Sequence, residues 1–317
     1  MVEIGIFLSS EEHDGTELVH MARQAEEAGF RRAWISDHYH PWIDAQGHSP
    51  FVWSVLGGIA ATTELHVTTA VTCPTFRIHP AVMAHAAATT AAMMPDRFTF
   101  GLGSGEALNE HVIGKRWPPA DVRLEMLGEA IDLMRALWTG EQVDWRGDHY
   151  LMEGARLYTL PDGEIPIQIS AFGSKAMDLV ISRGAGWITV APAPDLMRRF
   201  RAEGRGPAAA GTKVCWGPDE AAARRLAYER WPTSLVPGEL NQELPMPAHF
   251  EQAVSQVTED QVAEVIPCGP DPERHLANIR SYIDAGFDEI YISQIGPDQA
   301  GFLEFYQKEL APGLGLD

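Results

Sequence analysis

The stretch at 36–42 gathers side chains that proton transfer needs. It reads Ser-Asp-His-Tyr-His-Pro-Trp, so a carboxylate, imidazoles and an indole follow one another closely. Asp37 could orient a neighbouring base, and His38 could act as that base because imidazole titrates near neutral pH. Trp42 could form a flat apolar wall beside a substrate. The alternative is structural: His38 would be a capped loop histidine and Trp42 a core residue. The sequence of this stretch fits both interpretations.

A second stretch, at 103–110, reads Gly-Ser-Gly-Glu-Ala-Leu-Asn-Glu. Glycine has no side chain and lets the backbone approach a ligand closely, and Glu106 adds another group that can exchange a proton. The alternative is a tight turn in which Glu106 stabilises the start of a helix. Glu11, near the N-terminus, is a further candidate carboxylate.

A third stretch, at 170–174, reads Ser-Ala-Phe-Gly-Ser and leads into a helical pattern at 174–183. The free N–H groups at a helix start bind phosphate. They would suit an anionic cofactor here, because the chain has 24 basic and 44 acidic residues and a net charge of −20. A serine that only caps the helix is the alternative.

Short apolar runs alternate with longer helical patterns along the chain. Asp14 and Glu17 have the spacing of a capping box, the helix that they begin stops at Gly29, and another helix begins at Pro80. The predicted strands lie at 2–8, 32–36, 66–71, 98–103, 167–170, 187–190 and 289–292. The three stretches described above therefore follow the second, fourth and fifth predicted strands.

This alternation predicts an α/β protein with a parallel sheet. An open, doubly wound sheet would need a GxGxxG turn after the first strand, and the chain has Ser-Ser-Glu-Glu-His at 9–13 instead. We therefore predict a (β/α)8 TIM barrel that forms a single domain over residues 1–317. In such barrels the chemistry takes place where the strands end, so the three stretches are expected to share one mouth.

Two segments interrupt the alternation. Residues 144–160 predict a hairpin insertion with a turn at Arg-Gly-Asp, 146–148. Residues 191–267 are rich in proline, glycine and alanine, and they predict an elaborated loop and helical region over the barrel mouth.

Composition excludes several classes of protein. The net charge of −20 argues against nucleic acid and anionic membranes as partners. Cys73, Cys215 and Cys268 are scattered, and no His, Asp or Glu set has ligand spacing, so neither disulfides nor a metal site is expected. The chain lacks an apolar run of the ~20 residues that a membrane span needs, and its first residues do not resemble a signal peptide. We expect a cytoplasmic enzyme that acts on a small molecule.

Several motifs together resemble the F420-dependent glucose-6-phosphate dehydrogenase family, which belongs to the bacterial luciferase-like superfamily of barrels. The resemblance runs through the chain but weakens between 191 and 265. It is carried by SDHYHPW (36–42), GHSPF (47–51), AVTCPTFRIHP (70–80), GSGEALNE (103–110), LYTLPDGEIPIQIS (157–170) and FLEFYQKELAP (302–312).

The resemblance implies that coenzyme F420 is the cofactor and assigns residues to it. Asp37 would contact the polar side of the deazaflavin, and the peptide bond between Ala70 and Val71 would be cis behind the ring. The residues expected along the ring and ribityl chain are Cys73, Ser104, Gly105 and Asn109. The residues expected at the phosphate are Phe172, Gly173, Lys175 and Ala176. The residues expected on the substrate side are Glu11, His38, Trp42 and Glu106.

The implied reaction moves a hydride between a secondary alcohol carbon and C5 of the deazaflavin. His38 is the candidate base for the hydroxyl proton, and Glu106 would exchange a proton with the N1 side of the ring, which requires burial to raise its pKa. The two roles could be exchanged. The alternatives are an F420H2-dependent reductase of a ketone, imine or activated double bond, an FMN-dependent luciferase-like monooxygenase, and a non-catalytic cofactor-binding protein.

The resemblance also raises the question of the substrate. Relatives that use glucose 6-phosphate bind its phosphate with a cation past the sixth strand, but residues 189–193 read Thr-Val-Ala-Pro-Ala. Arg274 and Arg280 are the candidates to replace that cation. We expect an uncharged or cationic substrate with a secondary alcohol, or the corresponding ketone, rather than a sugar phosphate. By analogy with the family, the enzyme is expected to be a homodimer.

Overall fold

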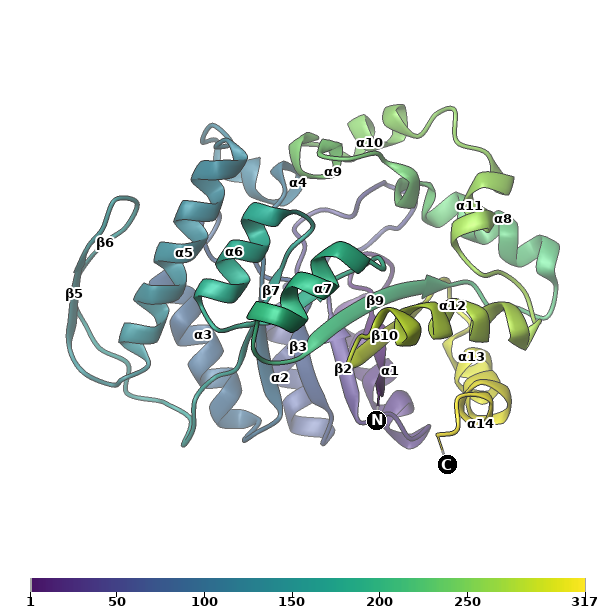
Figure 1. The fold of residues 1–317 in the computed structure, drawn as a ribbon, viewed down its shortest axis with the longest axis horizontal. Coiled ribbons are helices and arrows are strands. Elements are labelled where there is room, and N and C mark those ends of the chain that lie inside the picture. The colour runs from purple at the N-terminus through teal and green to yellow at the C-terminus, as the bar shows by residue number, and fades with distance from the viewer. Residues whose placement is uncertain (1, 317) are drawn as a thin grey trace.

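The computed structural model describes residues 2–316. Within them, eight parallel strands close into a barrel in the order β1-β10-β9-β8-β7-β4-β3-β2, and helices surround it (Figure 1). The predicted (β/α)8 barrel is therefore confirmed. The barrel strands are β1 (Glu3–Leu8), β2 (Arg32–Ile35), β3 (His66–Thr69), β4 (Phe98–Leu102), β7 (Ile167–Ser170), β8 (Gly186–Thr189), β9 (Ala208–Val214) and β10 (Glu289–Gln294).

Aromatic and small side chains fill the inside of the barrel. Trp34 on β2 stacks on Tyr291 of β10, with ring centroids 4.3 Å apart, and Ile188 and Ala209 complete this cluster. Gly211 on β9 faces the same space, because a Cβ added there would lie 2.8 Å from the ring of Trp34. The barrel is therefore closed below its mouth, as packed barrels of this class are.

The outer helices begin and end where the sequence signals them. Asp14 caps α1 by accepting from the backbone N–H of Glu17, whose side chain in turn accepts from the N–H of Asp14. Helix α3 begins at Pro80, as predicted. The outer helices are α1 (Gly15–Glu27), α2 (Val52–Thr62), α3 (Pro80–Met93), α5 (Ala120–Leu137), α6 (Ser174–Ser182), α7 (Pro194–Glu203), α12 (Pro272–Ala285) and α13 (Gln299–Phe305), the last continuing through the π-helical turn Tyr306–Leu310 into α14 (Ala311–Gly313).

Strand β9 and helix α12 were not recognised from the sequence. Strand β9 lies inside the 191–267 segment, so the interpretation of that segment as loops and helices alone is wrong. Its sequence, AAAGTKV, has little intrinsic strand preference, but it pairs with β8 on one side and β10 on the other. Gly211 is needed there because the ring of Trp34 occupies the space in front of it.

Two segments extend from the barrel. Strands β5 (Val143–Arg146) and β6 (Leu151–Ala155) pair antiparallel and project at one end of the molecule (Figure 1). Residues 220–265, which we call the roof, lie beyond the strand ends. The roof contains α8 (Glu220–Arg230), a 3₁₀ turn (Pro232–Leu235), α9 (Leu240–Glu243), α10 (Pro247–Ala253) and α11 (Glu259–Val265).

Arg123 of α5 anchors the roof to the barrel. Its buried guanidinium donates to Glu243 at 2.9 Å and to Gln242 at 2.8 Å, both on α9, and stacks on Trp117 at 4.7 Å. Helix α9 in turn packs against the short helix α4 (Ala107–Glu110), which continues as a 3₁₀ turn (His111–Ile113). The roof is therefore fixed to the loop that carries Glu106.

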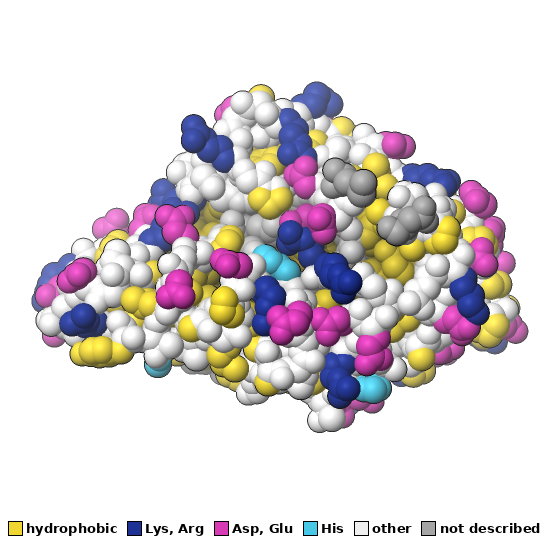
Figure 2. Space-filling view, turned by 90° about the horizontal axis from the view of Figure 1, so that it is seen from below, with side chains coloured by type: hydrophobic (Ala, Val, Ile, Leu, Met, Phe, Trp, Pro, Cys, Tyr) yellow, Lys and Arg dark blue, Asp and Glu magenta, His cyan; other side chains and the backbone are white. Residues whose placement is uncertain are grey.

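Acidic and basic side chains are interspersed on the face opposite the roof (Figure 2). Near the strand starts, Arg32 pairs with Glu3 at 3.3 Å and Arg97 with Glu64 at 3.2 Å. These arginines are therefore neutralised by neighbouring carboxylates. Among residues 2–316, the helices are all too short or too polar to cross a bilayer.

Candidate active site at the barrel mouth

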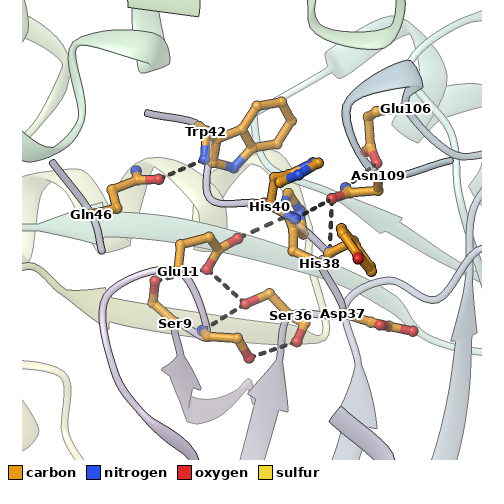
Figure 3. Close-up of polar contacts among 12 residues, drawn as sticks. Ser9, Glu11, Ser36, Asp37, His38, His40, Trp42, Gln46, Glu106 and Asn109 are labelled. Carbon is orange, nitrogen blue, oxygen red and sulfur yellow. Dashed lines mark hydrogen bonds and ion pairs between the residues drawn. The ribbon is translucent and has the colours of Figure 1, made fainter. Parts of the chain in front are cut away.

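Asn109 joins the loops that follow β2 and β4. Its Oδ1 accepts hydrogen bonds from the backbone N–H groups of Tyr39 at 2.9 Å and His40 at 3.2 Å. Its Nδ2 donates to Glu106 Oε2 at 3.3 Å (Figure 3). The two stretches that the sequence singled out, 36–42 and 103–110, therefore meet at one end of the barrel.

His38 presents one ring nitrogen for chemistry. Its Nδ1 lies 3.1 Å from the carbonyl oxygen of His40, and a carbonyl can only accept, so Nδ1 carries a proton. Its Nε2 faces Glu11 Oε1 at 3.5 Å (Figure 3). The ring of Trp42 lies 4.9 Å from the imidazole and covers it on one side. Nε2 is therefore the nitrogen that can exchange a proton with a ligand.

Glu11 is a buried carboxylate beside His38. Its Oε2 accepts from Ser9 Oγ at 2.8 Å and from Ser36 Oγ at 2.7 Å. Burial acts to raise the pKa of Glu11, but His38 and the two hydroxyl groups outweigh it and hold that pKa below its usual value. Glu11 is thus ionised near neutral pH, and its negative charge faces the imidazole of His38.

Asp37 belongs to a second buried network. Its carboxylate accepts from Thr72 Oγ1 at 2.8 Å and from Arg77 Nη2 at 3.1 Å. The backbone N–H of Arg77 donates to Glu110 Oε2 at 2.6 Å. Burial raises the pKa of Glu110 to about 7, against the opposing effect of the Arg77 charge. Sequence reasoning missed Arg77 and Glu110, because their partners are far away along the chain.

The pKa of Glu110 predicts how stability depends on pH. The folded protein binds this proton more tightly than the unfolded chain, where the pKa is 4.5. The contribution to stability is therefore complete below pH 4.5 and is lost as pH rises through about 7; a shift of this size corresponds to at most about 3 kcal/mol. We expect the melting temperature of the wild type to fall between pH 5 and pH 8, and that of Glu110→Gln to fall less. Calorimetry measures both.

The exposed carboxylate of Glu141, which forms no ion pair with the residues at 2–316, provides the control for this measurement. Glu141→Gln should follow the wild-type pH dependence. Parallel curves for wild type and Glu110→Gln would show that Glu110 does not titrate in this range.

A cavity of about 110 Å³ opens between the loops after β4 and β7. Gly105 has a φ of +84°, and a Cβ there would lie 2.6 Å from Cys73 Sγ, so only glycine fits this wall. Helix α6 starts beside the cavity without a side-chain cap, which leaves its first N–H groups available. The lining residues are Val71, Gly103, Ser104, Gly105, Glu106, Ala120, Leu124, Ser170, Phe172, Gly173, Ala176 and Gln242.

Most residues assigned to the cofactor by resemblance lie at or next to this cavity. The peptide bond between Ala70 and Val71 is cis, as expected. Cys73 is buried, and burial raises the pKa of its thiol well above the usual value. Lys175 lies in the first turn of α6, and its ammonium group is bound to Asp121 at 2.7 Å in an exposed ion pair. The helix N–H groups are therefore better placed than the Lys175 side chain to hold a phosphate.

The two arginines considered as replacement cations lie elsewhere. Arg274 donates to Glu220 at 2.8 Å, and Arg280 donates to the carbonyl of Gly313 at 2.9 Å. Both are on α12, outside the barrel. The expectation that they could substitute for the missing cation is therefore wrong.

The structure adds residues that the sequence did not suggest. Lys213 lies on β9, and recognising that strand would have shown a lysine near its carboxyl end. Gln242 and Trp231 come from the roof, where no motif identified them. Within residues 2–316, no group of three His, Cys, Asp or Glu side chains could hold a metal ion.

Comparison with known proteins identifies the family. The model of the luciferase-like monooxygenase family matches residues 2–289. F420-dependent glucose-6-phosphate dehydrogenases of Nocardia farcinica and Mycobacterium tuberculosis are 34% and 32% identical, over 99% of this chain and 98% of each relative.

Solved structures give the same result. An F420-dependent secondary alcohol dehydrogenase, in complex with an F420-acetone adduct, superposes with a TM-score of 0.88 and 29% identity, covering 97% of this chain and 98% of that one. The coenzyme F420-dependent tetrahydromethanopterin reductase of Methanopyrus kandleri has the same fold, with a TM-score of 0.75 and 21% identity over 98% and 99% of the two chains. The chain therefore belongs to the luciferase-like monooxygenase family, and its relatives within that family include the F420-dependent glucose-6-phosphate dehydrogenases.

Proposed function

We propose that this protein is an F420-dependent oxidoreductase that interconverts a small, uncharged secondary alcohol and its ketone. The observation that carries the proposal is the placement of His38 and Glu106 at one mouth, linked through Asn109, beside a cavity with an uncapped helix start. The likeness to F420-dependent dehydrogenases over nearly the whole chain supports the choice of cofactor.

The residues present fit this cofactor. Ser104 and Gly105 would lie along its ring system, and Phe172, which is 57% exposed at the rim, would cover the chain that leads to its phosphate. The N–H groups at the start of α6 would hold that phosphate without help from a basic side chain. Gly173 has open space where a Cβ would be, so the phosphate can approach the backbone.

When bound, F420 supplies a ring carbon that accepts or returns a hydride. His38 would take the hydroxyl proton of the alcohol on Nε2, and Glu11 would stabilise the resulting imidazolium. Trp42 would hold the substrate against His38 and keep water out. Glu106, which lines the cofactor cavity, would hold the proton exchanged with the ring nitrogen. In the direction of ketone reduction, both proton transfers reverse.

Charge favours an uncharged substrate. Residues 189–193 offer no cation, and Arg274 and Arg280 are engaged outside the barrel. Glu11 would repel an anion placed beside His38. A sugar phosphate is therefore a poor match for this mouth.

We also propose that the enzyme works as a cytoplasmic homodimer. Helices α2 and α3 pack together and expose large apolar side chains close to their ends, including Phe51, Val82 and Met93. Exposed apolar surface of this kind is typical of an interface between subunits.

The direct test is a spectroscopic assay with F420 and 2-propanol. We expect the purified protein to bind F420 and to bleach its visible absorbance when the alcohol is added. Binding of reduced FMN with oxygen consumption would instead indicate a monooxygenase, because a deazaflavin reacts poorly with oxygen. Binding of F420 without turnover of any alcohol or ketone would indicate a cofactor-binding protein without this activity.

A further inference from the structure

Lys213 is a cation at the mouth that the proposed mechanism does not use. Side chains alternate between the two faces of a strand, and Ala209 and Gly211 of β9 both face the inside of the barrel. Lys213, two residues further, therefore faces inward one layer above Gly211. Its register partner on β10 is Ser293, which in turn lies two residues beyond the inward-facing Tyr291.

The same layer holds the groups that bind Glu11. Ser36 lies two residues beyond Trp34 of β2, whose ring meets Gly211 of β9 inside the barrel, and its hydroxyl donates to Glu11. Ser9 follows β1 and donates to the same carboxylate oxygen. Lys213 thus belongs to the polar layer that separates the aromatic barrel interior from the substrate side.

The ammonium group of Lys213 has no hydrogen-bonding partner within residues 2–316. The ammonium group instead lies over the ring of Trp231 in the roof, with Nζ 4.2 Å from the ring centroid. That ring is itself fixed, because Trp231 Nε1 donates to Glu12 Oε1 at 2.5 Å and Glu12 also accepts from the N–H of Gly296. A partly buried ammonium group that lacks an acceptor is costly, so a ligand that supplies one binds favourably.

The charges around Lys213 determine which acceptor suits it. Burial lowers the pKa of Lys213, whereas the nearby carboxylates of Glu11 and Glu12 act to raise it. Burial raises the pKa of Glu12, and Glu11 is held ionised next to His38. Arg230 also acts on Glu12 from the roof. The positive charge is therefore already balanced, and a neutral oxygen fits better than a second anion.

Glu11 connects His38 with the layer of Lys213, because its carboxylate faces His38 and accepts from Ser36 in that layer, and its charge also acts on Lys213. His38 Nε2 is 3.5 Å from Glu11, whereas Lys213 Nζ forms no ion pair with it. A substrate that reaches both groups would place its reacting oxygen at His38 and another oxygen at Lys213.

We propose that Lys213 is a specificity residue that donates a hydrogen bond to a second, uncharged oxygen of the substrate. The inference rests on the proposed alcohol oxidation and narrows its substrate class to diols, hydroxyketones and related polyols. Lys213 contributes to binding and does not take part in the proton transfer at His38.

A matched pair of alcohols tests the proposal, because 1,2-propanediol is 2-propanol with one additional hydroxyl group. We expect Lys213→Met to lower kcat/KM for the diol by about 10- to 100-fold, mainly through KM, as expected for a lost hydrogen bond to a charged group. The value for 2-propanol should change less than about twofold, and Lys213→Gln, which keeps a donor, should recover part of the loss. Lys308→Met, at an exposed lysine of the C-terminal helical segment, is the control.

F420 binding and the melting temperature, measured beside kcat/KM, separate the possible outcomes. Equal losses for both alcohols, or no loss for either, would overturn the proposal. If the wild type binds F420 but oxidises neither alcohol, the proposed function has failed, and the melting temperature still tests Lys213. An ammonium group without a partner in the free protein predicts that Lys213→Met melts at or above the wild-type temperature, so a clear drop would show that Lys213 is structural.

Discussion

Replacing His38 with alanine is expected to lower kcat for alcohol oxidation by about 10²–10⁴-fold while F420 binding is retained. The imidazole is held in one orientation, because Nδ1 donates to the carbonyl of His40, so Nε2, which faces Glu11, is the nitrogen that can take the proton. The substitution removes the acceptor for the hydroxyl proton and leaves the cavity at α6 untouched. Steady-state bleaching of F420 gives kcat, and fluorescence titration gives the affinity for F420.

Two controls make this result specific. His20→Ala, at an exposed histidine of α1, should behave like the wild type. Added imidazole should restore part of the activity of His38→Ala, because the freed space adjoins Glu11 and Trp42. An alanine variant that keeps wild-type kcat would remove His38 from the proton transfer.

The barrel could be predicted because local patterns agreed with the global fold. Strands such as β1 are short, mostly apolar runs, and helices such as α1 carry their own capping box. Strand β9 could not be predicted in this way, since its alanines have little strand preference and its glycine is required by the ring of Trp34, which lies far away in the sequence. This seventh barrel strand was therefore missed, because the contact that requires its glycine cannot be read from the local sequence.

The site could be predicted in position but not in its connections. The rule that loops after barrel strands carry the chemistry placed His38 and Glu106 correctly at one mouth. It could not show that Asn109 joins their loops or that Ser36 holds Glu11. Those contacts depend on side-chain packing between segments that no local pattern relates.

The search for a phosphate-binding cation illustrates the same limit. The sequence left Arg274 and Arg280 as candidates without a secure alignment, and both are engaged on the outside of the barrel. Lys213 was overlooked because its strand was. Whether a side chain points into the barrel can be inferred only when its strand and the register of that strand are known.

Glu106→Gln is expected to reduce kcat by about 10²–10⁴-fold without loss of F420 binding. Glutamine has the same shape, and its amide oxygen can still accept the hydrogen bond from Asn109. The substitution therefore removes only the ability to exchange a proton at the cofactor cavity. The affinity for F420, measured by fluorescence titration, should stay at the wild-type value, whereas loss of a merely structural contact would weaken it together with kcat.

The double variant tests whether Glu106 and His38 serve the same step. If both proton transfers accompany one hydride transfer, combining His38→Ala with Glu106→Gln should cost much less than the product of the two single effects, because the chemical step is already abolished. Glu27→Gln, at an exposed carboxylate of α1, is the control and should match the wild type. Wild-type kcat in Glu106→Gln would instead mean that the ring nitrogen exchanges its proton with water, and that Glu106 only shapes the wall beside Asn109.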